Sequence, residues 1–341
     1  CITLDGESSA ITVSACGGMG LVFGLCDLER RIRVDEDRVF LSFPECVGNQ
    51  PKQIIEVPAL EQRGEYLNIG YNFSGITPHD WSRERWECYI DRLLLANLNT
   101  FYFYIWVDAY SMNPKSALAQ KALSRKIHED IRYVIQYAHK RGLNVVYMFC
   151  PTFLPLDLWE RHPEIHADIE YVKHGFPAVC PNAPNAWEMM VENARAEMEW
   201  FKEADVIQLW FYDPGGCWCE RYGCKQHQAE SLARQAKTFG ALFREYNPNA
   251  AIEINLWPMW LWETLQQVNY RAETFRLIRE YFGEEASAIT VVGAPDNNIT
   301  QPLAEKEMGF KTSVFLFGTN PERGYVFTVP TLQSPHTRGN S

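Results

Sequence analysis

From Arg63 onward, the chain alternates between short apolar stretches and longer amphipathic ones. Seven short stretches have the length and composition of buried parallel strands, at residues 67–72, 100–107, 143–149, 206–213, 251–257, 288–293 and 312–318. Helices are predicted between them at residues 82–96, 116–141, 185–203, 228–246, 271–282 and 301–308. This alternation predicts an α/β fold of the (β/α)8 TIM-barrel type. A doubly wound open sheet is the alternative, but no glycine-rich phosphate-binding turn follows an early strand.

The eighth unit of such a barrel is not visible in the pattern. Residues 325–329 have the composition of a strand, but six residues after Gly318 leave no room for a crossover helix. We therefore expect a barrel that is incomplete at its C-terminal end and spans residues 61–341. Residues 1–60 predict a partial small α/β domain before it, with strands at 10–15, 39–43 and 54–57 and an amphipathic helix around residues 21–32.

Composition excludes some classes of partner. The 341-residue chain has a formal net charge of −11 and a pI near 5.3, which argues against a nucleic-acid partner because such partners usually meet a basic patch. No apolar run approaches the ~18 residues of a membrane span. The chain starts at Cys1 without a signal-peptide pattern, so its start indicates no compartment.

Acids, amides and aromatic residues gather near the carboxyl ends of the predicted strands. Successive strand residues face opposite sides, so either the odd-numbered or the even-numbered residues of each strand face the barrel interior. The polar and aromatic parity comprises Asn68, Gly70 and Asn72, then Tyr102, Tyr104, Trp106 and Asp108, then Gln208, Trp210 and Tyr212 before Asp213, then Glu253, Asn255 and Trp257, with Asp296 after the sixth strand. Such a mouth suits a sugar, whose hydroxyls bind acids and amides while its apolar face lies on an aromatic ring. Taken one at a time, these acids could equally bridge strands or cap helices.

A cysteine-rich segment follows the fourth strand. Cys217, Cys219, Cys224 and His227 place four soft ligands within eleven residues, a spacing compatible with a tetrahedral zinc site. Because protein would fill all four positions, such a zinc would be structural and catalysis would need no cofactor. Three free thiols with a surface histidine, or one disulfide, are the alternatives. The other histidines show no ligand spacing and are expected at the surface or in loops.

Two stretches then resemble known enzymes. Residues 11–33 and 54–70, the latter containing Arg63-Gly64, are similar to the junction in retaining β-hexosaminidases (glycoside hydrolase family 20) and α-glucuronidases (family 67), where a small α/β domain precedes a barrel. The cysteine-rich segment and Cys180-Pro181-Asn182 resemble other members of the same hydrolase superfamily. The resemblance implies a secreted or periplasmic protein. It places Arg63 where hexosaminidases hold the terminal sugar and Asp213 near their Asp-Glu pair, although Pro214 stands here in place of the glutamate.

These observations predict an enzyme that cleaves a glycosidic bond in an oligo- or polysaccharide. Asp213 and Glu253 are the expected carboxyl pair and Glu220 is the reserve acid. The sugar-binding residues would be Arg63, Asn72, Trp106, Asp108, Tyr212, Trp257 and Asp296. One alternative is a non-catalytic glycan-binding barrel derived from a glycosidase. Another, a metal-dependent barrel enzyme, would need histidines at the strand tips, and none lies there in the predicted arrangement.

Overall fold

The computed structural model describes residues 1–5, 10–36, 38–42, 52–58, 60–70, 78–169, 177–211, 216–256, 270–293, 309–317 and 323–328. Within these residues, eight strands form a closed barrel in the order β10-β11-β12-β13-β6-β7-β8-β9. Their bounds are β6 Arg63–Ile69, β7 Thr100–Ile105, β8 Asn144–Phe149, β9 Val206–Trp210, β10 Ala251–Asn255, β11 Thr290–Gly293, β12 Lys311–Phe317 and β13 Arg323–Thr328. The seven strands from β6 to β12 are those predicted from the sequence, and neighbouring members pair in parallel. The α/β barrel prediction is therefore confirmed in its main feature.

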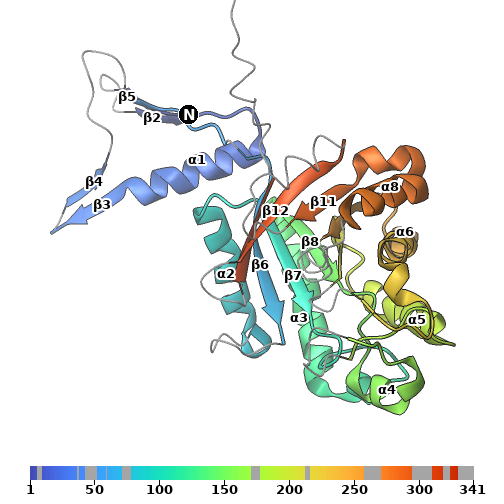
Figure 1. Cartoon of the computed structure of the whole chain (residues 1–341). Helices are drawn as coiled ribbons and strands as arrows, with labels where there is room; N and C mark the ends of the chain where they lie inside the picture. Colours follow the sequence, from blue (N-terminus) through green and yellow to red (C-terminus); the bar gives the residue numbers. More distant parts are fainter. Residues whose placement is uncertain are drawn as a thin grey trace, which may run out of the picture.

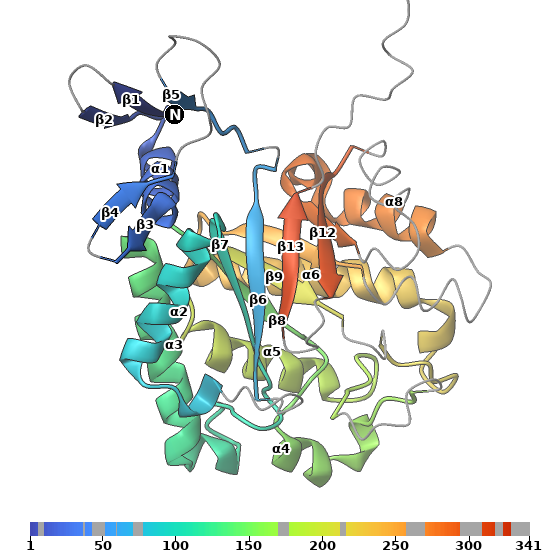
Figure 2. The same cartoon turned by 90° about the vertical axis from the view of Figure 1, so that its left-hand side faces the viewer.

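The eighth place in the barrel is filled by an antiparallel strand. β13 pairs antiparallel with both β12 and β6, so it joins the last parallel strand to the first, and the three lie side by side in Figure 2. Because the connection from β12 is short, it permits only a hairpin-like reversal. The prediction that the eighth parallel unit is missing agrees with the seven parallel strands, and the antiparallel β13 closes the sheet in its place.

The described helices pack along part of the outer side of the barrel, as Figures 1 and 2 show. Their bounds are α2 Arg83–Leu95, α3 Ala122–Lys140, α4 Leu156–Arg161, α5 Ala186–Met198, α6 Gln228–Tyr246 and α8 Tyr270–Phe282. The side chain of Ser82 accepts a hydrogen bond from the Arg85 amide and so caps the start of α2. Gly142, with φ of +79°, follows the end of α3 as its sequence position predicts. The predicted helix at 301–308 lies outside the described residues.

Two predicted helices are shorter than expected. Lys121 is extended (φ −77°, ψ 131°) and separates α3 from the short 3₁₀ helix Ala117–Gln120, so the predicted start at residue 116 was six residues too early. At the other helix, α5 ends at Met198 because the amides of Trp200 and Phe201 bond to carbonyls three residues back, which tightens the turns up to residue 203.

The strand residues divide between two apolar layers according to their parity. Leu67, Phe103 and Ile254 belong to the cluster between the sheet and the helices, while Tyr66, Tyr104 and Trp210 belong to the cluster inside the barrel. The expected alternation between an inner and an outer parity is therefore present, but the outer layer also holds aromatic residues such as Tyr147, while Val146 and Met148 lie in the inner one. Side chains fill the barrel interior, as they do in small barrels generally.

The amino-terminal segment contributes its own secondary structure. Strands β1 Ile2–Asp5, β2 Ala10–Val13 and β5 Lys52–Ile54 form an antiparallel sheet, and β3 Ile32–Asp35 pairs with β4 Arg38–Leu41. Helix α1, Gly18–Arg31, packs Met19, Val22 and Phe23 against the outer layer of the core. In Figure 1 these elements lie at the end of the barrel opposite α4. Among the described residues, no helix combines the length and apolarity that a bilayer crossing requires.

Candidate functional site

The strand carboxyl ends carry an aromatic cluster. The Tyr104 ring lies 5.3 Å from the Trp106 ring and 5.5 Å from the Trp210 ring, centroid to centroid, and Trp106 lies 6.0 Å from Phe153. Trp106 is only 2% exposed, and its indole N–H donates a hydrogen bond to the side-chain oxygen of Asn68. Trp106 directly follows β7 and is packed inside this cluster, so it does not present an open ring face.

Gly70 permits close packing at the same place. Its φ is +122°, and a Cβ atom there would lie 2.9 Å from the Tyr110 ring and 3.1 Å from Cβ of Trp106. Only glycine adopts such a backbone conformation readily. Gly70, directly after β6, can therefore lie against the segment after β7 that carries Asp108.

Asp108 is the described carboxyl group best suited to acid chemistry. It lies three residues beyond β7, at the carboxyl end of the barrel, and is partly buried. Burial raises its pKa from the usual 3.8 to about 6, although the backbone amides of Asp108 and Ala109 partly oppose the shift. Its Oδ1 atom is buried without a hydrogen-bond partner among the described residues. A carboxyl group with this pKa is partly protonated near neutral pH and can donate a proton.

A buried polar network holds the segment that follows Asp108. Glu197 on α5 accepts hydrogen bonds from the Ser111 hydroxyl (2.5 Å) and the Met112 amide (2.9 Å). Its other oxygen lies 2.8 Å from Nε2 of His128 on α3, and Nδ1 of His128 lies 2.8 Å from the Ser124 carbonyl. His128 is fully buried, so the expectation of surface or loop histidines is wrong for this residue. A signal was available, because His128 shares its helical face with Ile131 and Ile135.

Glu253 does not lie at the mouth. It is the third residue of β10, and it is paired in register with Gln208, the third residue of β9. Its carboxylate accepts hydrogen bonds from the amides of Gln208 (2.8 Å) and Gln62 (3.2 Å), and Gln62 reaches it from the chain just before β6. Burial raises its pKa, and the side chain is 3% exposed. Glu253 therefore belongs to a buried polar cluster in the barrel interior, at the middle of β10, and the expected pairing with Asp213 across a sugar does not fit this position.

The sequence assigned Glu253 to the catalytic carboxyl pair, but its buried position changes the expected effect of Glu253→Gln. The substitution replaces an acceptor of two amide donors by a group that brings its own N–H atoms, so we expect it to lower the free energy of unfolding by about 1–3 kcal/mol. Any catalytic rate should change by no more than a few-fold. Urea denaturation and initial rates measure the two effects, with Glu280→Gln on the exposed face of α8 as the control. Loss of turnover in a fully folded Glu253→Gln protein would contradict this structural role of Glu253.

Arg63 also lies away from the mouth. It is the first residue of β6, and its guanidinium donates hydrogen bonds to the carbonyls of Asn97 (2.8 Å) and Leu60. The same group lies 5.3 Å from the centre of the Phe23 ring on α1. It lines a cavity of about 480 Å³ between the amino-terminal segment and the barrel. Arg63 therefore anchors α1 at the amino end of the strands, and its expected role in holding a sugar at the mouth is wrong because a strand's first residue faces the opposite end.

The remaining predicted residues divide into two groups. The Glu220 side chain is 79% exposed and lies 3.7 Å from the Lys225 ammonium. It therefore lacks the buried surroundings of a general acid. The others lie outside the described residues: Asn72, Tyr212, Asp213, Trp257 and Asp296.

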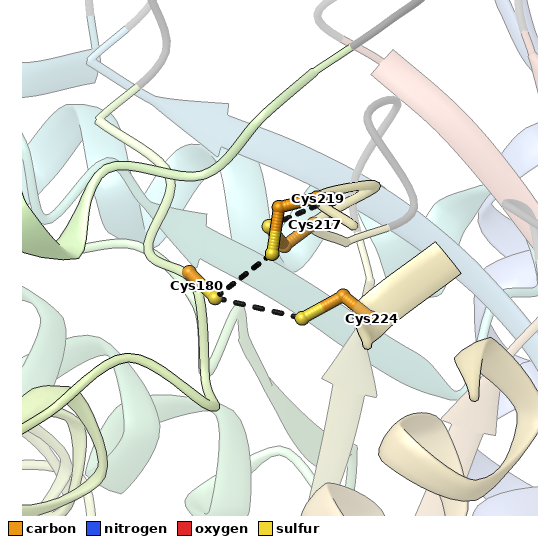
Figure 3. Close-up of side chains that lie close together, drawn as sticks. All are labelled: Cys180, Cys217, Cys219 and Cys224. Atoms are coloured by element: carbon orange, nitrogen blue, oxygen red, sulfur yellow. Dashed lines mark hydrogen bonds between the residues drawn. The ribbon is translucent and has the colours of Figure 1, made fainter. Parts of the chain in front are cut away.

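The cysteine cluster differs from its prediction in one member. The sulfur atoms of Cys180, Cys217, Cys219 and Cys224 all lie within 4.8 Å of one another, and Figure 3 shows them converging from two segments. His227 is not among them, because its side chain is 62% exposed and its Nδ1 lies 3.3 Å from Glu230. Short sequence spacing pointed to His227, whereas the fold supplies Cys180 from the segment between β8 and α5. Four converging sulfur atoms form a donor set that suits a soft metal ion.

Comparisons with known proteins find this architecture among solved structures. No family model matches the chain, and no curated protein matches it. Among solved structures, the GH20 exo-β-N-acetylglucosaminidase from Vibrio harveyi in complex with N-acetylglucosamine aligns with a TM-score of 0.59 and 15% identity over 91% of this chain and 49% of that one. The Flavobacterium johnsoniae chitobiase, also GH20, aligns with a TM-score of 0.58 and 16% identity over 91% and 45%.

A GH138 enzyme targeting pectin rhamnogalacturonan II also matches, with a TM-score of 0.58 and 11% identity over 91% of this chain and 35% of that one. The chain thus spans about half the length of these two GH20 enzymes and about a third of the GH138 enzyme. At these identities the likeness concerns the fold, and the resemblance to family 67 stays a prediction. By its fold, the chain resembles the glycoside hydrolases that are built on TIM-type barrels, GH20 enzymes among them.

Proposed function

We propose that this barrel binds a saccharide at the carboxyl ends of its strands and cleaves a glycosidic bond there. Asp108 carries the proposal, because cleavage needs one carboxyl group that is protonated near neutral pH. Its pKa of about 6 comes from burial, the same cause that prepares general acids elsewhere. The likeness in fold to glycoside hydrolases supports the choice of substrate class.

Asp213 is the proposed second carboxyl group. It follows β9 by three residues in the chain, and β9 is separated from β7 only by β8. Carboxyl ends of parallel strands meet at the same end of a barrel, so the segments after β7 and β9 can contribute to one mouth. Asn72, Tyr212, Trp257 and Asp296, each directly following a barrel strand or close to its end in sequence, remain the proposed sugar contacts. Arg63, Glu220 and Glu253 are not part of this proposal.

A non-catalytic glycan-binding barrel is the second candidate. Pro214 follows Asp213 where the resemblance to hexosaminidases calls for a glutamate. A barrel without that acid could keep its sugar contacts and lose its chemistry. Residues 1–60, with the sheet β2-β1-β5 and helix α1, are proposed as a small accessory domain in either case.

A glycoside screen on the full chain tests both candidates. The panel should include aryl β-N-acetylglucosaminides and other aryl glycosides, together with oligosaccharides, and calorimetry should measure binding of the same sugars. We expect hydrolysis of at least one class, and NMR of the first anomer released then gives the stereochemical outcome. Binding without turnover would favour the glycan-binding barrel. If the folded chain neither hydrolyses nor binds any member, both candidates are wrong.

A further inference from the structure

The four cysteine sulfurs come from two segments far apart in sequence. Cys180 lies between β8 and α5, whereas Cys217, Cys219 and Cys224 lie between β9 and α6. The Cys180 sulfur is 3.5 Å from that of Cys224 and 3.7 Å from that of Cys219, across separations of 44 and 39 residues. Three of the four residues are at most 3% exposed, and Cys219 is partly buried. Figure 3 shows the four side chains directed toward a common centre.

The spacing of the sulfur atoms fits a tetrahedral metal site. With a zinc–sulfur distance of about 2.3 Å, the edge of a regular tetrahedron is about 3.8 Å. The two measured separations lie within 0.3 Å of that edge, and the remaining pairs lie within 4.8 Å. Sulfur atoms in a disulfide would instead be about 2.05 Å apart. A set of four thiolates in this geometry is typical of structural zinc.

The surroundings favour ionised sulfur. The backbone amides of Asp168 (3.3 Å) and Cys219 (3.4 Å) donate to the sulfur of Cys217. The side-chain amide of Asn182 lies 3.5 Å from the sulfur of Cys224. Hydrogen bonds of this kind orient metal-bound thiolates and disperse their negative charge.

A cation is linked to the cluster through the side chain of Asn182. Four thiolates around a divalent ion carry a net charge of −2, which a buried site tolerates poorly without positive groups nearby. Arg234 on α6 donates a hydrogen bond of 2.8 Å to the side-chain oxygen of Asn182, the residue that also contacts Cys224. The guanidinium of Arg234 lies 4.4 Å from the centre of the Trp187 ring, which fixes its position between α5 and α6.

We propose that Cys180, Cys217, Cys219 and Cys224 bind one zinc ion that fastens the β8–α5 segment to the β9–α6 segment at the carboxyl end of the barrel. All four ligand positions are filled by protein, so the ion stabilises the fold and activates no water. The site joins the segment that leads from β9 toward α6, the same segment that contains Asp213. The proposal does not depend on the proposed glycosidase function, because it concerns only these four residues.

Metal analysis of matched variants tests the proposal. The full chain, prepared without a metal-binding tag and in zinc-containing medium, should hold about one zinc per chain. We expect Cys180→Ser to lose most of this zinc and His227→Ala to keep it. Cys150→Ser, a buried cysteine outside the cluster, is the control and should also keep the zinc. The comparison separates Cys180 from His227 as the fourth ligand.

A second measurement applies to the unaltered protein, in case Cys180→Ser does not fold. Removal of zinc with a chelator should lower the melting temperature and expose four further thiols to a thiol reagent, and added zinc should reverse both changes. Cobalt in place of zinc should give the intense absorption of a tetrahedral thiolate complex. The proposal is overturned if the folded chain holds no zinc after exposure to it, if iron occupies the site as isolated, if the cysteines are joined in disulfides, or if His227→Ala loses the metal and Cys180→Ser keeps it.

Discussion

An Asp108→Asn protein is expected to cleave its glycoside about 10²–10⁴-fold more slowly than the unaltered chain, the usual contribution of a positioned general acid. The reason is that asparagine has the shape of aspartate but no proton to give to the departing oxygen. Substrate affinity should change little, because the amide still accepts the backbone hydrogen bonds made by Asp108 and Ala109. Initial rates across a series of leaving groups measure the effect, which should be smallest for the best leaving group.

The pKa of Asp108 sets the direction of two pH effects. A general acid must be protonated, so kcat/KM of the unaltered enzyme should fall as the pH rises through about 6. The raised pKa also means that the folded state holds the proton more tightly than the unfolded state. Stability is therefore lost as the pH rises from about 4 to 6, by an amount on the order of 3 kcal/mol at most. Asp108→Asn should consequently be the more stable protein above pH 6 and no more stable below pH 4.

Two further variants make this prediction specific. Asp80→Asn alters an exposed acid near Tyr110, with a side chain that is 68% exposed, and should leave rate and pH dependence unchanged. Asp213→Asn should remove turnover as well. If Asp108→Asn retains full turnover on every substrate of the unaltered enzyme, Asp108 is not the acid.

A Glu197→Ala protein should lose about 3–5 kcal/mol of unfolding free energy, the usual result of removing one member of a buried pair. The substitution leaves the Ser111 hydroxyl, the Met112 amide and Nε2 of His128 without their common partner. Both members of the His128–Glu197 pair are at most 1% exposed, so water cannot replace the lost contacts. Urea denaturation measures the loss.

Glu197→Gln is the informative comparison. The amide keeps one oxygen for Ser111 and Met112, and its NH2 can donate to Nε2 of a neutral His128 whose Nδ1–H donates to the Ser124 carbonyl. We therefore expect a loss of only about 0.5–1.5 kcal/mol. Glu192→Ala on the same helix removes an exposed ion pair with Lys115 and should cost at most about 1 kcal/mol. If glutamine is as damaging as alanine, the network depends on a full negative charge and not on its hydrogen bonds.

Much of the architecture could be predicted because the local periodicity of apolar residues determines where helices and strands form. The α6 prediction, residues 228–246, matches the structure at both ends, and Gly142 marks the turn after α3. The strand parities divided the inner from the outer layer because side chains alternate strictly along a strand, whatever the strand pairs with. A residue count also showed that no crossover helix could follow β12, although the antiparallel closure by β13 was not anticipated.

Only the tertiary structure decided how far along the barrel axis each polar residue lies and which residues meet across it. Glu253, Arg63 and Asp108 all occur near strands, yet the strand bounds and register put Glu253 in the buried middle of β10, Arg63 at the amino end of β6 and Asp108 beyond the carboxyl end of β7. His227 was near the cysteines in sequence, but Cys180 is near them in space. Periodicity depends on neighbours within a few residues, and the sequence alone determines it. Burial, and with it the pKa of Asp108 and the fourth sulfur of the cluster, depends on contacts between segments tens of residues apart, which exist only once the barrel has closed.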